Sequence, residues 1–233
     1  MVAQASACGR QCDAFPAQCP GFAQALTLFY DVPVPNAPVL GPILCDSCGV
    51  VAAPDHIRER MARLELSTRH RPFHIGLLLV CTAPPINPDD DLYAWERQSS
   101  SAESRPYIES LFACVGVSTE KTPAEQLADL QRRGVYFARL IECPMPEGVR
   151  PEELAAKFGS VLAKRINYSY KPRQIALLSP VADGLAEILI SAGFGDRLVA
   201  SGKGIQIPSA TDSGAIAAVR AIFSKAISAS EGG

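Results

Sequence analysis

The sequence predicts an α/β protein of three layers, in which helices cover both faces of a central, mainly parallel sheet. Short apolar runs bounded by proline or glycine, typical of buried strands, alternate with longer segments of helical periodicity. This alternation favours a parallel sheet. With 233 residues, 48% of them hydrophobic, the chain is long enough for one sizeable core and short for two.

Residues 1–54 differ from the rest of the chain. They hold five of the eight cysteines and seven of the prolines. Proline lacks a backbone donor and resists regular structure. We therefore expect a cysteine- and proline-rich arm at 1–54, an α/β domain at 55–227 and a disordered tail at 228–233.

From residue 55 onward, helices and strands are predicted in alternation. Asp55 can cap a helix that ends at Arg71, and Phe73–Cys81 is an apolar run short enough for a strand. A rigid, proline-rich loop with three consecutive acids follows at 82–91. The remaining elements are helices at 107–115 and 122–133, a strand at 135–141, a helix at 151–166, a strand at 175–178, a helix at 181–192, one or two strands at 198–207 and a helix at 213–227.

The formal net charge of −2 gives no general excess of basic residues for binding phosphate backbones. Any contact with nucleic acid must be local. The densest basic stretches are 58–71 and 164–173, and a solvated helix surface is the simpler interpretation of both. No apolar run is long enough to span a membrane and the start lacks a signal peptide, so we expect a cytoplasmic protein with reduced thiols and no membrane partner.

Parallel sheets bind ligands at the carboxyl ends of their strands, which directs attention to three loops. Leu78–Pro85 resembles the first motif of the uracil-DNA glycosylase superfamily, especially the branch in which a strand runs into Gly-Glu-Ala-Pro-Gly. Leu140–Pro146 resembles that branch's central strand and its Cys-Arg-Pro-Pro turn. Gln206–Thr211 stands where the family has His-Pro-Ser. The three motifs occur in the family's order over roughly residues 57–227.

This resemblance implies a uracil-DNA glycosylase-like fold with DNA as partner, and a pocket that accepts one flipped base. In the family, the first motif handles the attacking water and the second donates a hydrogen bond to the departing base. The pocket is then expected from 81–95, 143–146 and 206–211. The base-binding residues implied by this match are Thr82, Ala83, Pro84, Pro85, Trp95, Ser209 and Thr211.

The sequence departs from the family at both catalytic positions. Thr82 occupies the place of the motif's glutamate and Ile207 the place of its histidine, and neither side chain can do that chemistry. All three histidines precede the first motif. The reacting group would then come from the acidic loop, from Asn87, Asp89, Asp90 or Asp91, with Asp90, Asp89 and Asn87 as the candidate catalytic residues, unless that loop is simply a solvated turn.

Other candidate ligand residues also have structural interpretations. Ser209 or Thr211 could bond a base or phosphate, or could cap the following helix. Trp95, the only tryptophan, could stack on a base, although core packing is the more frequent role of such a residue.

The cysteines suggest a metal. Cys45 and Cys48 have the two-residue spacing that lets both thiolates reach one ion. The resembled branch carries a four-iron cluster, and Cys143 matches its third ligand, while the fourth is missing. If the arm binds a metal, we expect either a [4Fe-4S] cluster or zinc, with the remaining ligands among Cys8, Cys12 and Cys19; the alternative is that these thiols bind no metal.

Three functions are compatible with the sequence. The first is a divergent uracil-DNA glycosylase-like protein that binds, and in an active form excises, a base from DNA. The second is a non-catalytic DNA- or metal-binding protein that retains the fold. The third is a hydrolase of small nucleoside-like substrates, which the modest charge favours.

Overall fold

The structure, a computed structural model, describes residues 41–231. The chain divides between Gly41 and Pro42, and the fold described is that of the unit that begins at Pro42. This unit begins at Pro42 and so includes residues that the sequence assigned to the arm. The proposed ligands Cys8, Cys12 and Cys19 lie outside the described residues.

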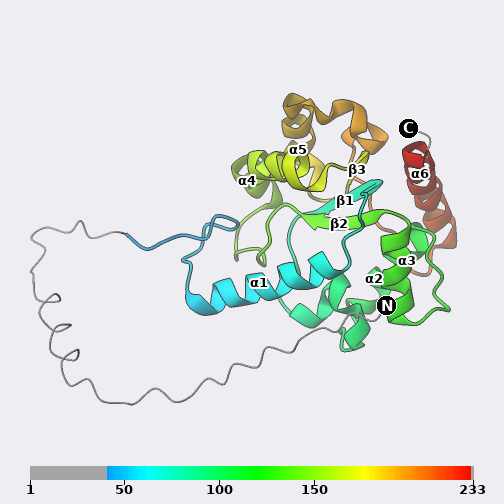
Figure 1. Cartoon of the computed structure of the whole chain (residues 1–233), viewed down its shortest axis with the longest axis horizontal. Helices are drawn as coiled ribbons and strands as arrows, with labels where there is room; N and C mark the ends of the chain where they lie inside the picture. Colours follow the sequence, from blue (N-terminus) through cyan, green and yellow to red (C-terminus); the bar gives the residue numbers. More distant parts are fainter. Residues whose placement is uncertain (1–40, 232–233) are drawn as a thin grey trace, which may run out of the picture. The chain divides into compact units, whose positions relative to one another are not determined.

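A small parallel sheet forms the centre of the larger unit (Figure 1). Strand β1 (Leu77–Cys81) lies between β2 (Val135–Arg139) and β3 (Gln174–Leu177), in the order β2-β1-β3. Leu79 is level with Phe137 on one side and with Ala176 on the other. The prediction of a mixed α/β fold with parallel strands is therefore confirmed.

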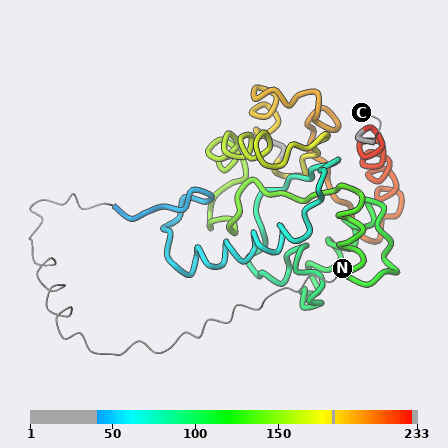
Figure 2. Tube along the Cα trace, viewed as in Figure 1, coloured from blue at the N-terminus to red at the C-terminus, as the bar shows by residue number. Residues whose placement is uncertain are grey.

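Helices lie on both sides of these strands in Figure 1, with α4 and α5 on one side and α1, α2 and α3 on the other. The chain can be followed through them in Figure 2. The bounds are α1 Pro54–Arg69, α2 Arg105–Cys114, α3 Pro123–Arg132, α4 Pro151–Arg165, α5 Ala182–Leu189 and α6 Ser213–Glu231. Two short 3-10 turns, η1 (Pro88–Asp90) and η2 (Leu92–Arg97), follow β1.

Local sequence signals explain several helix starts. Thr122 and Glu125 form a reciprocal capping box at the start of α3. Pro151 opens α4, followed by two acids that suit the positive end of the helix dipole. Asn87 and Asp91 cap η1 and η2 by accepting backbone N–H bonds, which fixes the loop after β1.

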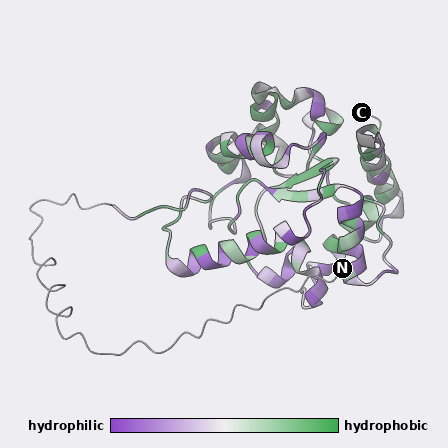
Figure 3. Cartoon of the chain, viewed as in Figure 1, coloured by the Kyte–Doolittle hydropathy of each residue, from purple (hydrophilic) through white to green (hydrophobic). Residues whose placement is uncertain are grey.

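The core is continuous around the strands, which are coloured as hydrophobic in Figure 3. Leu77, Leu78 and Val80 of β1 are fully buried, as expected for a central strand covered on both faces. In the described part of the chain, no helix is long and apolar enough to cross a membrane.

Two elements differ from the predictions. Residues 198–207 form no strand but a 3-10 turn, η6 (Val199–Gly202), with only isolated bridges to β3 and its end. Ala200, Ser201 and Gly202 adopt positive φ angles, which interrupt an extended strand. Helix α6 continues to Glu231, into the segment expected to be a disordered tail; Ala229 and Glu231 have high helix propensity, and no glycine or proline precedes Gly232 in that segment.

Candidate functional site

Four side chains from three separate segments form a group that could hold a metal ion. Cys45 and Cys48 stand on a turn before α1, His56 is in the first turn of α1, and Cys143 follows β2. Their ligand atoms all lie within 4.8 Å of one another. The three cysteines are buried and His56 is partly buried.

The spacing of these atoms fits one tetrahedral ion. The sulfurs of Cys45 and Cys143 are 3.8 Å apart, and His56 Nε2 lies 3.4 Å from the sulfurs of both Cys48 and Cys143. Zinc–sulfur bonds of about 2.3 Å at tetrahedral angles place two sulfurs about 3.8 Å apart. These three distances match a single tetrahedral ion, and all four ligand atoms lie within 4.8 Å of one another.

The turn that carries Cys45 and Cys48 is closed by its own backbone. The Cys45 N–H donates to Val50 O at 2.7 Å, and the Gly49 N–H donates to Cys45 O at 2.8 Å. Gly49 has a φ of 77°, where a side chain would be strained. This turn presents both thiols to the same point.

A charged network surrounds the group. Glu142, next to Cys143, accepts bonds from Arg60 of α1 at 2.9 Å and from Arg165 of α4 at 2.6 Å, and its N–H donates to Ser47 Oγ. Arg60 also bonds Asp46. Burial alone would lower the pKa of Arg60, but these two carboxylates raise it above its ordinary value. The network holds the ligand-bearing segments together.

The electrostatic environment favours ionisation of one thiol. Burial raises the pKa of Cys45, but hydrogen bonds from the Ser47 backbone and from His56 outweigh that effect and bring it to about 6. The thiolate is the form that binds metal.

The sequence predicted three members of this group and missed the fourth. Cys45, Cys48 and Cys143 come together, but the position expected for a cysteine of the arm is occupied by His56. The signal was a histidine in the first turn of the helix that follows the Cys-x-x-Cys turn.

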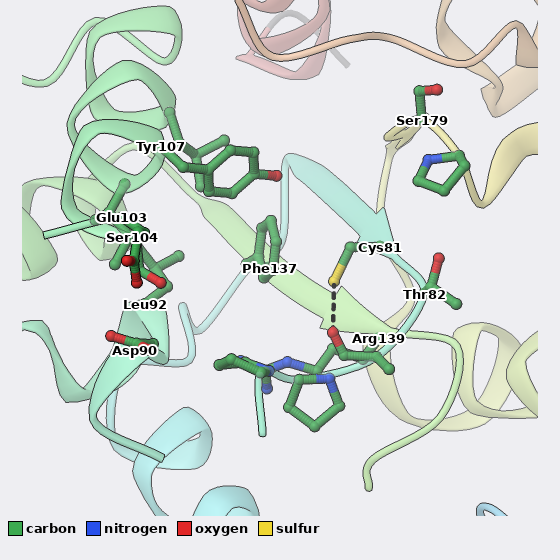
Figure 4. A pocket seen from close by; sticks show the side chains of 16 residues that line it. Cys81, Thr82, Asp90, Leu92, Glu103, Ser104, Tyr107, Phe137, Arg139 and Ser179 are labelled. Carbon is green, nitrogen blue, oxygen red and sulfur yellow. Dashed lines mark hydrogen bonds between the residues drawn. The ribbon is translucent and has the colours of Figure 1, made fainter. Parts of the chain in front are cut away.

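A separate pocket of about 430 Å³ opens at the carboxyl edge of the sheet (Figure 4). In Figure 4, Tyr107, Glu103 and Asp90 lie on one side and Thr82 and Ser179 on the other. The ring of Phe137 lies between them. The pocket is lined by Cys81, Thr82, Ala83, Pro84, Pro85, Asp90, Leu92, Glu103, Ser104, Tyr107, Ile108, Leu111, Phe137, Arg139, Ser179 and Pro180.

Asp90 is held firmly at the wall of this pocket. Its carboxylate accepts hydrogen bonds from the Ser101 N–H at 2.6 Å and from the side-chain amide of Asn87 at 3.2 Å. These bonds, the Ser101 N–H foremost, lower the pKa of Asp90 below its ordinary value. Asp90 is therefore a carboxylate at neutral pH and not a general acid.

Arg139 reaches the pocket from the end of β2, two residues after Phe137 and on the same face of the strand. Its guanidinium donates to both oxygens of Asp91 at 2.6 Å, and both side chains are buried. Burial alone would lower the pKa of Arg139, but Asp91 raises it. The positive charge of Arg139 is thus already neutralised.

Two polar groups in the pocket wall have no ionic partner. Burial raises the pKa of the Cys81 thiol to about 12, so it stays protonated. The Thr82 hydroxyl is buried without a hydrogen-bond partner among the described residues. An unpaired buried hydroxyl is costly, so Thr82 has an unused capacity to bond a ligand or a water.

The remaining sequence candidates stand away from the pocket. Asn87 serves as the cap of η1, and Asp89 is paired with Arg97. Trp95 is buried and its indole N–H donates to Gln126 at 2.6 Å. Ser209 and Thr211 are exposed and bond each other, and residues 143–146 and 206–211 do not line the pocket.

The absence of residues 206–211 from the pocket wall has a plain physical cause. Ile207, in the place of the family's histidine, packs into the core, which turns its loop away from the pocket. The pocket wall that this loop was expected to supply comes instead from α2, through Ser104 just before the helix and Tyr107 within it.

No family model, curated protein or solved structure matches this chain.

Proposed function

We propose that this protein is a divergent uracil-DNA glycosylase-like protein that binds a nucleobase-sized heterocycle in the pocket at the carboxyl edge of its sheet. The observation that supports this most is the juxtaposition of the Phe137 ring with the fixed carboxylate of Asp90. An aromatic face stacks on a planar ring, and a carboxylate accepts ring N–H or amino groups.

The size and lining of the pocket suit such a ligand. About 430 Å³ is within the range of small-molecule sites, which are mostly apolar with a few fixed polar groups. Tyr107 adds a second ring, while Glu103 and the unpaired Thr82 hydroxyl add hydrogen-bonding capacity. A bound base would bury its ring faces against these aromatic side chains and form hydrogen bonds with these polar groups through its edge.

The charge of the pocket favours a free base or a nucleoside over a nucleotide. Two carboxylates, Asp90 and Glu103, face it, and Arg139, the one cation among the described residues that line it, is committed to Asp91. Like charges in such a wall oppose a phosphate. A base taken from DNA would enter only after extrusion, with its phosphates left outside.

For the metal, we propose a single structural zinc ion bound by Cys45, Cys48, His56 and Cys143. Four protein donors close a tetrahedral site and leave no position for substrate, as in structural zinc sites. A four-iron cluster binds each thiolate to a different iron, which requires wider spacing than the 4.8 Å that contains all four atoms.

A second candidate function is base excision with Asp90 as a relocated water-positioning group. In that reaction water adds its hydroxyl to the sugar C1′, and the base leaves with the electrons of the glycosidic bond and takes up the proton. Asp90 is ionised and lines the pocket, which supports this role. With Ile207 in the core, no histidine assists the departing base, so any turnover is expected to be slow.

Calorimetric titration of the metal-loaded chain with uracil, hypoxanthine, their nucleosides and their monophosphates tests the binding proposal. We expect bases and nucleosides to bind and monophosphates to bind more weakly. Glu103→Gln and Phe137→Leu should each weaken binding, whereas Phe73→Leu, an exposed ring outside the pocket, should not. Equal binding of monophosphates, or no binding of any base, would overturn the proposal.

Base release from oligonucleotides containing uracil or hypoxanthine tests the second candidate. Release that is abolished in Asp90→Asn would support Asp90 as the relocated water-positioning group. Release unaffected by that substitution would remove Asp90 from the reaction.

A further inference from the structure

Five cationic side chains gather at the amino-terminal edge of the sheet, opposite the pocket. Arg71 precedes β1, Lys171 and Arg173 precede β3, and Lys164 lies in the last turn of α4. Arg197 ends the short turn η5 (Gly195–Arg197). Because the strands are parallel, these segments meet at one edge.

The surface between these side chains is concave. Three hollows of about 510, 700 and 200 Å³ adjoin there. The first two share Tyr168 and Arg197, and the last two share Lys171 and Arg173, so together they form one groove. Among the residues that line this groove, none is aspartate or glutamate.

The positive charges of the groove are not neutralised within the described part of the chain. Lys164, Lys171 and Arg173 make no ion pair there, while Arg71 and Arg197 donate to the carbonyls of Ser169 and Pro172. Elsewhere on the surface, exposed arginines do pair with acids, as Arg58, Arg69 and Arg150 do. A protein with net charge −2 thus keeps a local basic groove.

Exposed aromatic rings accompany these charges. Tyr168 is 74% exposed and Phe73 is 95% exposed, unusual for side chains of their size. Arg71 lies over the ring of Tyr170 at 5.5 Å, and Arg197 over that of Phe194 at 5.7 Å. These contacts restrain two guanidinium groups before any ligand arrives.

We propose that this groove binds single-stranded nucleic acid, with phosphates on the five cations and bases stacked on Tyr168 and Phe73. Cations that follow a groove, together with exposed rings, are the features that sequence-tolerant single-strand sites combine. An acidic peptide would use the charges but gain little from the rings. The inference is independent of the pocket, which lies at the other edge of the sheet.

Fluorescence anisotropy of labelled oligothymidylate and oligouridylate of about 20 nucleotides, with the metal-loaded full chain, tests this proposal. If all five cations contact phosphates, a plot of the logarithm of the binding constant against the logarithm of the salt concentration should have a slope of about −3.5. Lys171→Glu/Arg173→Glu should weaken binding at least about tenfold and reduce that slope by about 1.4. Lys203→Glu/Lys225→Glu changes the net charge equally outside the groove and should have little effect.

Tyr168→Ala separates stacking from charge. It should weaken binding about fivefold or more and leave the salt slope unchanged. Nucleoside titration of the pocket should be the same in every groove variant. The proposal is overturned if no oligonucleotide binds at low salt, if the two charge-reversal variants behave alike, or if polyglutamate binds as tightly and Tyr168→Ala has no effect.

Discussion

The buried pair of Asp91 and Arg139 allows the sharpest prediction about stability. The two side chains are 3% and 8% exposed, and the guanidinium donates to both carboxylate oxygens. Asp91→Asn removes the negative charge but retains an oxygen that can cap η2. The charge of Arg139 is then buried without an anion, which costs about 3–5 kcal/mol.

This loss of stability should lower the melting temperature measurably. In a domain of this size each kcal/mol lowers the melting temperature by about 2–4 °C, so a loss of about 4 kcal/mol predicts about 8–16 °C. Thermal unfolding of metal-saturated protein followed by circular dichroism measures it. Asp89→Asn is the matched control, because its pair with Arg97 is partly exposed to solvent and worth at most about 1 kcal/mol. A melting temperature for Asp91→Asn within about 2 °C of the wild type would refute the reasoning.

Three further predictions concern the two sites. His56→Asn should release the metal, as measured by elemental analysis of the purified protein. His74 is an exposed histidine outside the group, so His74→Asn should retain the metal. Equal metal content in both variants would remove His56 from the ligand set. Cys81 should resist iodoacetamide at about pH 8 in the folded chain, by peptide mass spectrometry, because burial raises its pKa to about 12; rapid labelling would contradict this. The affinity of the pocket for a nucleoside should be constant from about pH 8 to pH 5. The reason is that the pKa of Asp90 is lowered below the ordinary value of about 3.9, so its charge is lost only in stronger acid. An affinity that falls between about pH 6 and pH 5 would contradict this prediction.

Half of the metal group could be predicted from the sequence, because Cys45 and Cys48 are close enough along the chain for spacing alone to indicate a shared ion. Cys143 was found through a family resemblance. His56 was missed because helix geometry, not a spacing rule, brings it to the thiols. A site assembled from three segments can be recognised in full only when the fold is known.

The sequence predicted a pocket at the carboxyl edge of the sheet, where the structure has one, but two of its three expected wall segments, 143–146 and 206–211, do not line it. Strand alternation indicated the loop after β1, and Thr82–Pro85 and Asp90 do line the pocket. The contribution of α2 depends on how that helix packs, which no local pattern encodes. Trp95 was an ambiguous candidate because its partner, Gln126, lies on a different helix, α3.

The segment 198–207 shows the limit of composition as a guide. Its apolar residues favoured a strand, and Leu198, Val199 and Ile205 are indeed buried. Ala200, Ser201 and Gly202 between them adopt positive φ angles, so the chain turns and only two isolated bridges form. The burial of these side chains was predictable from their apolar character, whereas the backbone conformation is set by the turn at 199–202.

The central claim, that the pocket holds a nucleobase-sized ring, is tested most directly by a crystal structure of the metal-loaded chain grown with hypoxanthine or its nucleoside. The account predicts electron density for the ring against Phe137, with a ring N–H or amide group bonded to Asp90 or Glu103. A pocket that contains only water at saturating ligand, or ligand bound elsewhere on the protein, would contradict it.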